Sequence, residues 1–520
     1  MSIYLKHMKE KQVPQTKKAS KGQKKNNAGG YSFKLDNWSN LDRFLILGCE
    51  GGTYYVSEEK TTKKNVKWFE KCLKEDFKRT IDTIASISLS GRAIKNDPAI
   101  FLLGLAASHK DSDIVEYALS KVNEVCRIGT HLFQFVETVN EMRGWGRSLR
   151  DGVSNWYLSK TIDKLTYQVT KYKQRNGWSH RDVLRLAHPK PESAERNELF
   201  KYITAGDIGE NAYLQAVEEL KTATDKRRIE LIKEFNLPRE VLPTECLNST
   251  KIWEALLEDM PMTAMIRNLG KMSSIGILKP LSKNEKLVKA ALTNSDNLKR
   301  ARIHPFSLLL AYKNYGMGRG FRGALSWDVN QSIVGALEDA YYLAFNYVEP
   351  SNKNFLFGID VSGSMTWTIN NTNISCAEAS ACLAMTSMRT EPNTYAFGFT
   401  NTFVDLGISP KDDLKSVYNK VQRSNFGCTD CAIPMLHATK NKLDVDVFVV
   451  LTDSETYAGR VHPHKALEEY RQIMGKSAKL IVVGMTSNRF SIADPEDPHQ
   501  LDIAGFDANC PQVITEIAKL

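Results

Sequence analysis

The sequence predicts a two-domain fold in which a series of stacked α-helical hairpins precedes an α/β domain with a doubly wound parallel sheet. Three observations support this prediction. Apolar residues recur at helical spacing from about residue 41 to residue 348, short apolar runs alternate with amphipathic segments after about residue 350, and charge is segregated between the two parts. A chain of 520 residues is long enough for at least two hydrophobic cores.

The first thirty residues differ in composition from the rest of the chain. Residues 1–30 contain eight lysines, one glutamate and few large apolar side chains. Such a segment buries too little apolar surface to offset the entropy lost on ordering. We therefore predict a disordered lysine-rich tail at residues 1–30, which either helps to capture a polyanion or only keeps the terminus solvated.

Residues 31–350 are predicted to form the helical domain. Apolar side chains at three- and four-residue intervals predict helices at residues 65–74, 98–108, 114–127, 130–142, 252–260 and 306–315. Polar or Gly/Pro breaks separate these segments, and no strand pattern intervenes. The succession is typical of an α-solenoid of helix pairs, although the sequence shows no fixed repeat period.

Residues 351–520 are predicted to form the α/β domain. Apolar runs at residues 355–361, 395–399, 445–451 and 480–484 alternate with amphipathic helices at residues 376–389, 414–422, 431–440, 465–474 and 513–519. Nearly continuous apolar strands that are joined by helices indicate a parallel sheet covered on both faces.

Five oxygen-bearing side chains stand where the predicted strands and loops end. They are Asp360, Ser362, Ser364, Thr429 and Asp453. Ligands of doubly wound sheets bind beyond the carboxyl ends of the strands, and Mg²⁺ prefers an octahedron of oxygen atoms. The pattern therefore predicts one divalent metal ion, Mg²⁺, with an open position for an incoming acid group. The alternative is that these residues only cap helices and turns. We favour the metal site because all five occur together.

A basic segment lies in the helical domain. Residues 160–190 hold eight Lys and Arg residues and only two acids. A helix at residues 162–173 places its apolar and basic residues on opposite faces, Asn176-Gly177 is expected to end it, and Ser179 is expected to cap the next helix with Asp182 at the capping-box position. The candidate contact residues are Lys164, Lys171, Arg175, His180, Arg181, Arg185 and His188.

The chemistry of this basic segment suits a nucleic acid. Lys and Arg contact phosphates, while Trp178 and His180 offer rings that stack on unpaired bases. The plainer alternative is a solvated helix face with Trp178 in the core. We favour binding because few acids offset the charge, and because a second basic stripe, at Arg143, Arg147 and Arg150, precedes the segment.

Charge and composition narrow the functional classes. The net charge of +10 divides into +14 for residues 1–350 and −4 for residues 351–520, which indicates a polyanionic partner for the helical domain. The sequence shows no export signal and no apolar run long enough to cross a bilayer. Nine cysteines without zinc spacing indicate reduced thiols, with Cys428 and Cys431 as buried small residues. Glycines at residues 316–320 follow a helix, which argues against dinucleotide binding.

Several long motifs carry a family resemblance. They lie at residues 41–48, 51–55, 169–180, 302–306 and 484–488. Together they closely resemble the family of the large Ro autoantigen (the SS-A/Ro ribonucleoprotein), the TROVE-domain proteins, from about residue 41 to the C-terminus. The five candidate metal ligands likewise resemble the metal-ion-dependent adhesion site of von Willebrand factor A domains.

The resemblance implies a monomeric ring of HEAT-like repeats closed by a von Willebrand A domain. It implies a cytoplasmic RNA-binding protein, not an enzyme, with the nucleus as a further compartment and no membrane partner. In that family the central hole takes single-stranded ends of misfolded small RNAs, and the outer surface binds Y RNAs. By motif match Lys171, Arg175 and His188 resemble those contacts, whereas Lys164, Arg181 and Arg185 follow from helical phase alone.

Two alternatives to RNA binding remain at the level of the sequence. The chain could be a protein-adhesion scaffold that acts mainly through the metal site, with a partner that supplies an acidic side chain. It could also be a metal-dependent hydrolase, for which Glu455 and Asp430 are the nearby general bases.

Overall fold

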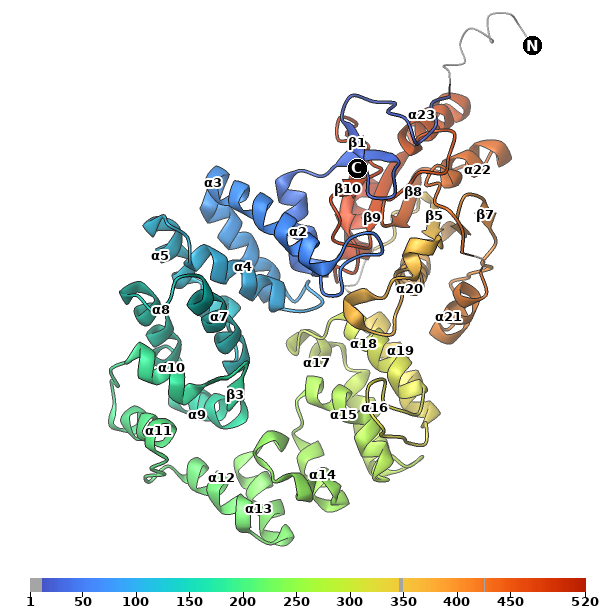
Figure 1. Cartoon of the computed structure of the whole chain (residues 1–520). Helices are drawn as coiled ribbons and strands as arrows, with labels where there is room; N and C mark the ends of the chain where they lie inside the picture. The colour runs from blue at the N-terminus through green and yellow to red at the C-terminus, as the bar shows by residue number, and fades with distance from the viewer. Residues whose placement is uncertain (1–11, 346–348, 425) are drawn as a thin grey trace, which may run out of the picture. The chain divides into compact units, whose positions relative to one another are not determined.

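The computed structural model of the chain describes residues 12–345, 349–424 and 426–520 (Figure 1). Contacts divide the chain into two compact units. The helical unit consists of Cys72–Gly91 and Asn96–Ala344. The α/β unit joins the described residues up to Lys71, together with Arg92–Lys95, to the described residues from Phe345 to Leu520. This division differs from the predicted boundaries because the described residues before Lys71 belong with the C-terminal domain.

The helical unit is a succession of short helices (Figure 1). α4 packs against α5 and α7, α8 packs against α5 and α10, and α18 packs against α15 and α19. Each helix thus contacts near neighbours in the chain, as in an α-solenoid. The helices after the second half of α3 (Glu58–Ser90) are α4 (Asp97–Ala107), α5 (Ser112–Ser120), α6 (Val122–Val125), α7 (Gly129–Met142), α8 (Arg147–Leu158), α9 (Ile162–Lys171), α10 (His180–Ala187), α11 (Ala194–Ala205), α12 (Ala212–Thr222), α13 (Asp225–Phe235), α14 (Thr250–Glu258), α15 (Met262–Ser274), α16 (Lys283–Leu292), α17 (Ser295–Arg300), α18 (Pro305–Gly316) and α19 (Gln331–Leu343).

Five of the six helices predicted for the helical domain are confirmed, whereas closure into a ring stays a prediction. Residues 114–127, predicted as one helix, form α5 and α6. In the described ranges of the chain, no helix is both long and apolar enough to span a membrane.

A short hairpin interrupts the helices at the basic segment. α9 ends at Lys171, and β3 (Gln174–Arg175) pairs antiparallel with β4 (Trp178–Ser179). Asn176 and Gly177 have φ values of 51° and 78°. A two-residue hairpin turn needs positive φ at both central residues, and Asn-Gly supplies them at low cost. Asn176-Gly177 therefore forms the hairpin turn and does not end the helix, which corrects the prediction.

The sheet of the α/β unit has the order β11-β9-β8-β5-β6-β7. All neighbours are parallel except β7, which pairs antiparallel with β6 at the edge. The doubly wound prediction is confirmed, and the antiparallel β7 makes the sheet mixed. The strands are β5 (Asn354–Asp360), β6 (Asn393–Phe399), β7 (Phe403–Val404), β8 (Val447–Thr452), β9 (Lys479–Gly484) and β11 (Gln500–Ala504).

Helices cover this sheet in two groups. α20 contacts α21 and α24, whereas α22 contacts α23. β8 is buried at every residue because it lies inside the sheet, which explains its continuous apolar sequence. The helices are α20 (Cys376–Thr390), α21 (Leu414–Gln422), α22 (Ile433–Asn441), α23 (Pro463–Met474) and α24 (Cys510–Lys519).

The lysine-rich segment is folded wherever the structure describes it. β1 (Gln23–Lys25) and β2 (Tyr31–Lys34) pair with each other, and β2 pairs with β10 (Phe490–Ser491). The prediction of a disordered tail is therefore wrong for residues 12–30, while residues 1–11 lie outside the described residues. The segment has no core of its own, but it finds backbone partners and buried surface on a distant part of the chain.

Helix α2 (Asn37–Leu47) is held on the sheet by a buried arginine. Arg43 is 1% exposed, and its Nη2 lies 2.6 Å from Oδ2 of Asp502 on β11. A Cβ atom on Gly484 would lie 2.2 Å from the guanidinium carbon. Only glycine therefore allows Arg43 to approach the end of β9.

All nine cysteines are free thiols, as the sequence predicts. Cys431 is buried, but Cys428 is exposed. The prediction that both are buried is therefore right for Cys431 and wrong for Cys428.

Candidate functional site

The candidate metal site lies between β5 and β8. These strands are parallel neighbours, with Ile359 opposite Leu451. The chain continues from β5 to β6 on one side and from β8 to β9 on the other, so the strand order reverses here. Asp360 is the last residue of β5, and Asp453 directly follows β8. Both carboxylates thus stand at the switch point where such sheets bind ligands.

Backbone hydrogen bonds join the three loops that carry the five candidate ligands. Gly363 N donates to Gly427 O at 2.9 Å, and Tyr457 N donates to Thr429 O at 3.1 Å. These bonds link the loop after β5, the loop before α22 and the loop after β8. All five candidate side chains are at least 97% buried: Asp360, Ser362, Ser364, Thr429 and Asp453.

The local hydrogen bonds fix the orientation of the carboxylates. Thr452 Oγ1 donates to Asp360 Oδ2 at 2.6 Å, and Ser362 N donates to Asp360 Oδ1 at 2.9 Å. The hydroxyl oxygens of Ser362 and Ser364 lie 3.3 Å apart. Glu455 N donates to Asp453 Oδ1 at 3.1 Å. These bonds orient the Asp360 and Asp453 carboxylates and hold the Ser362 and Ser364 hydroxyls together, and Ser364 also hydrogen-bonds to Asp453.

The electrostatics of this site favour a bound cation. Burial, with the charge of Asp453, raises the pKa of Asp360 well above its usual range, and burial raises the pKa of Asp453. Two buried carboxylates repel each other, and a divalent cation between them would relieve that repulsion. Two carboxylates and three hydroxyls also match the oxygen preference of Mg²⁺. The residues present therefore fit such an ion.

Sequence reasoning missed two neighbours of the site. Thr452 contacts Asp360 as described, and the phenol of Tyr55 lies beside Ser364. Burial and the charge of Asp453 raise the pKa of Tyr55. Thr452 could have been identified by its place at the end of a strand. Tyr55 lies about three hundred residues away in the sequence, where only the motif at residues 51–55 marked it.

The two general bases that the hydrolase alternative needs are already engaged. Glu455 accepts hydrogen bonds from Asn27 N at 2.7 Å and Ala28 N at 3.1 Å. Asp430 accepts from Ala432 N at 3.0 Å and from Gln15 Nε2 at 2.6 Å. A carboxylate that anchors backbone in this way is poorly placed to remove a proton from water, so the structure gives the hydrolase alternative little support.

The N-terminal segment holds the loop that carries Asp453. Gln15 is fully buried, and its Nε2 donates to Val461 O at 2.7 Å. Asn26 Nδ2 donates to Thr456 O at 2.8 Å, and Ser32 Oγ donates to Ser454 O at 2.9 Å. The segment predicted as a tail therefore positions one side of the candidate metal site.

The structure places six of the seven candidate RNA contacts at the surface of α9, the hairpin and α10. Lys171 is half-buried, with its Nζ 5.1 Å from the ring centre of Tyr167 and 5.5 Å from that of Tyr172. Its Nζ also donates to the Tyr167 hydroxyl at 2.9 Å. The five exposed residues are Lys164, Arg175, Arg181, Arg185 and His188. We call these six residues the basic surface.

The lysines and arginines of the basic surface have no acidic partner. Among the residues whose side chains the structure describes, no ion pair joins any of them to a carboxylate. The carboxylate of Asp182 instead caps α10, where it accepts from Ser179 N at 3.0 Å. The predicted capping box is thereby confirmed. α8, which carries Arg147 and Arg150 of the second stripe, packs against α10.

The prediction that His180 contacts RNA is wrong. It is 3% exposed, its ring stacks on Trp156, and its Nδ1 lies 2.8 Å from the Tyr157 hydroxyl oxygen. A base cannot reach a ring that other side chains enclose, so His180 is a core residue. Trp178 is half-buried beside Trp145, with ring centres 6.2 Å apart, and part of its surface remains open.

Comparisons with family models and with known proteins point to the same family in both parts of the chain. The TROVE domain matches residues 24–241 and 236–316, and the Ro60 vWA domain matches residues 354–518. The RNA-binding protein RO60 of Deinococcus radiodurans is 40% identical over 516 residues, which cover 97% of each chain. The RNA-binding protein RO60 of Caenorhabditis elegans is 36% identical over 591 residues, covering 97% of this chain and 92% of that protein.

A solved structure supports the fold. The crystal structure of the Deinococcus radiodurans RO (RSR) protein superimposes with a TM-score of 0.71 at 39% identity. The match covers 93% of this chain and 99% of that chain.

Burial of His180 predicts a measurable acid sensitivity. Burial lowers the pKa of His180 to about 3, whereas a histidine in the unfolded chain titrates near pH 6.5, at about its unperturbed value. Below about pH 6.5 the unfolded chain therefore binds a proton at this histidine, whereas the folded protein does not. The free energy of unfolding consequently falls as the pH is lowered toward 3. His180→Gln should flatten the pH dependence of the unfolding free energy by up to about 1.4 kcal/mol per pH unit.

Urea denaturation at pH 7, 6 and 5 measures this effect. The exposed His188 provides the matched control, and His188→Asn should leave the slope unchanged. An unaltered slope in His180→Gln would contradict this prediction, because it would show that the ring takes up protons equally in the folded and unfolded states.

Proposed function

Because the chain belongs to the family of TROVE-domain Ro60 proteins, we propose that it binds RNA and that the basic surface contacts the RNA phosphates. The observation that carries this proposal is the array of lysines and arginines on α9, the hairpin and α10 without acidic partners. The names of the two relatives, both RNA-binding proteins, support the same conclusion.

The basic surface has the chemistry that a flexible RNA strand requires. Unpaired cations release condensed counterions from phosphates, which supplies most of the affinity at low salt. The rings of Tyr167 and Tyr172 hold the ammonium group of Lys171 in place, which reduces the entropy lost on binding. The partly open ring of Trp178 lies on the hairpin between the two helices, where a base can stack.

The finer identity of the RNA follows from the family resemblance. We propose that single-stranded ends of misfolded small RNAs and structured Y RNAs are the ligands, and that the protein stabilises or sorts them in cytoplasmic ribonucleoprotein particles. Binding without catalysis is sufficient for this role.

Removal of two central cations should weaken RNA binding. In Lys171→Ala/Arg175→Ala, affinity for a small RNA with a single-stranded end should fall by at least about tenfold, because two phosphate contacts are lost. The slope of log K against log salt should decrease in magnitude by about 1.4, at about 0.7 per contact with a single strand. Fluorescence anisotropy at salt concentrations from about 50 to about 200 mM measures both the affinity and its salt dependence.

The control removes the same charge elsewhere. Lys415 and Lys440 are exposed residues on α21 and α22 of the α/β unit. The variant Lys415→Ala/Lys440→Ala should keep wild-type affinity. Equal losses in both double variants would mean that only net charge matters, and the basic surface would not be the binding site.

We also propose that the site between β5 and β8 holds Mg²⁺ and, through it, an acidic group of a partner. The support is the buried set of two carboxylates and three hydroxyls at the switch point. When bound, the ion would supply a Lewis-acidic position for a carboxylate ligand. Thr452 and Glu455 N would keep the two aspartates in place. This second function, adhesion to a protein, is compatible with RNA binding through the other unit.

Mg²⁺ should raise the melting temperature of the protein, and Asp360→Asn should abolish that rise. The variant removes one of two repelling buried carboxylates, so its stability without metal should be equal to or above that of the wild type. Differential scanning fluorimetry with and without Mg²⁺ checks both statements. Asp405, an exposed residue in the same unit, gives the control Asp405→Asn.

RNA affinity provides the second readout for this variant. Asp360→Asn should bind RNA as the wild type does. A Mg²⁺ response that persists in Asp360→Asn would contradict the metal site.

A further inference from the structure

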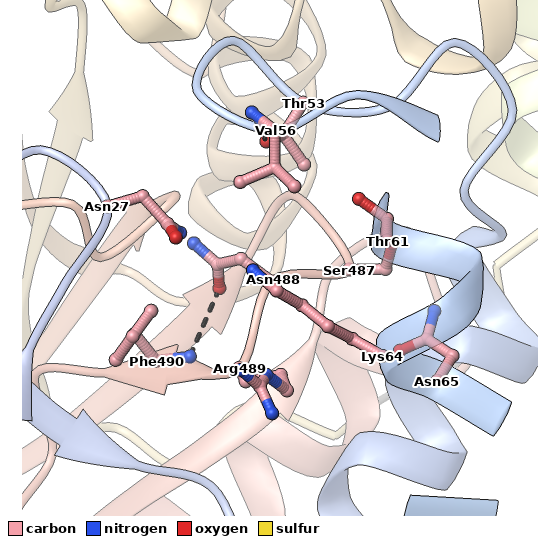
Figure 2. A pocket seen from close by; sticks show the side chains of 10 residues that line it. All are labelled: Asn27, Thr53, Val56, Thr61, Lys64, Asn65, Ser487, Asn488, Arg489 and Phe490. Atoms are coloured by element: carbon pink, nitrogen blue, oxygen red, sulfur yellow. Dashed lines mark hydrogen bonds between the residues drawn. The ribbon is translucent and has the colours of Figure 1, made fainter. Parts of the chain in front are cut away.

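A hollow in the α/β unit has none of the five candidate metal ligands in its lining, although one lining residue, Asn488, donates a hydrogen bond to the backbone oxygen of Asp453. It measures about 300 Å³ including its open mouth. Its walls come from the N-terminal segment, the start of α3 and the loop before β10 (Figure 2). It is lined by Asn27, Thr53, Val56, Thr61, Lys64, Asn65, Ser487, Asn488, Arg489 and Phe490. Figure 2 shows Lys64 reaching from α3 across this hollow toward Asn488.

Cations without acidic partners gather around the hollow. Lys64 and Arg489 line it. Burial and then the charge of Arg489 lower the pKa of Lys34, which lies nearby on β2. Within the described parts of the chain, none of the three forms an ion pair with a carboxylate. Burial and the charge of Arg489 lower the pKa of Lys64, and burial lowers the pKa of Arg489. Folding therefore holds like charges together with only partial compensation, which a bound anion would relieve.

Glu455 is the nearby acid, and it does not neutralise the cluster. Its charge favours the protonated form of Lys64, but less than burial and Arg489 disfavour it. Its oxygens already accept hydrogen bonds from the backbone of Asn27 and Ala28 and from Asn488 Nδ2 at 3.2 Å. The cations consequently remain available to a ligand.

A buried amide supplies the second, independent observation. Asn65 is 2% exposed, and its Oδ1 accepts a hydrogen bond from Trp68 Nε1 at 2.9 Å. Its Nδ2 has no acceptor among the described residues, although it belongs to a lining residue of the hollow. A buried donor without an acceptor is uncommon in folded proteins and indicates a missing hydrogen-bond partner.

We propose that this hollow binds a phosphate-class oxyanion, with Lys64 and Arg489 supplying positive charge and the Asn65 amide a directed hydrogen bond. A dianion matches two cations in charge, and its tetrahedral oxygens accept donors that approach from α3 and from the loop before β10. The guanidinium of Arg489 suits two of these oxygens at once. The ligand is either free phosphate or the terminal phosphate of an RNA strand, which share this chemistry.

Titration with inorganic phosphate tests the site in the full-length protein. At constant ionic strength, phosphate in place of chloride should raise the melting temperature, and calorimetry should show one bound ion. Lys64→Gln and Arg489→Gln should each weaken binding by about tenfold or more, because each removes a charged hydrogen bond. Lys415→Gln, which removes an exposed charge of the same unit, should bind as the wild type does.

Asn65→Asp tests the geometry with little change in shape. Its carboxylate keeps an acceptor for Trp68 Nε1 but replaces the free donor with a negative charge that pairs with the cations. The variant should fold and lose the phosphate response. A wild-type response in Asn65→Asp, in Lys64→Gln or in Arg489→Gln would overturn the proposal, as would the absence of any response in the wild type.

Two RNA oligonucleotides that differ only in a 5′-phosphate distinguish the sources. Tighter binding of the phosphorylated strand, lost in Arg489→Gln, supports an RNA terminus as the ligand. Equal binding of the two strands, together with a response to inorganic phosphate, supports a free phosphate. Lys171→Ala/Arg175→Ala should retain the phosphate response, so failure of this proposal and failure of the RNA-binding surface give different results.

Discussion

The buried guanidinium of Arg43 is the constraint on which the α/β unit depends. It forms an ion pair with Asp502 and donates from Nη1 to Asn488 Oδ1 at 3.1 Å and to Phe490 O at 3.2 Å. A buried charge that loses its partner costs about 3 to 5 kcal/mol, so these contacts must form together. Asn488 in turn donates to Asp453 O and to Glu455. One arginine in α2 thus fixes the loop before β10 and, through Asn488, the loop that carries the candidate metal ligand.

This arrangement gives the N-terminal part of the chain a structural role in both proposed sites of the α/β unit. Gln15, Asn26 and Ser32 hold the loop after β8, and the start of α3 contributes Lys64 and Asn65 to the anion hollow. The helical unit follows a different principle. There, short helices stack on near neighbours, and the amphipathic helices α9 and α10 carry cations at the surface that form no ion pair among the described residues. The proposed basic surface of the helical unit and the two proposed sites of the α/β unit therefore use different charged groups.

The spacing of apolar residues along the sequence predicted most helices and strands, because it directly reflects which side chains are buried. The continuous apolar run of β8 and the capping box at Ser179 both reflect local interactions, and both are confirmed. Contacts between segments far apart in the chain leave no pattern in the local sequence, so they could not be predicted. The lysine-rich segment looked disordered because its hydrogen-bond partners lie more than four hundred residues away, as with Gln15 and Val461. His180 looked like a surface residue because helical phase alone does not show that Trp156 and Tyr157 enclose it. The five candidate ligands could be named from the sequence because strand ends are predictable, and the structure brings their loops together, whereas the place of Tyr55 beside Ser364 could not be predicted.

The proposed RNA phosphate contacts are the cations of α9, the hairpin and α10. Photo-crosslinking of the intact protein to a small RNA with a single-stranded end, followed by mass spectrometry of the crosslinked peptides, locates these contacts. Crosslinks should concentrate in residues 162–188, with Trp178 and Arg175 among the modified side chains. Crosslinks confined to the α/β unit, with none in that segment, would contradict this prediction.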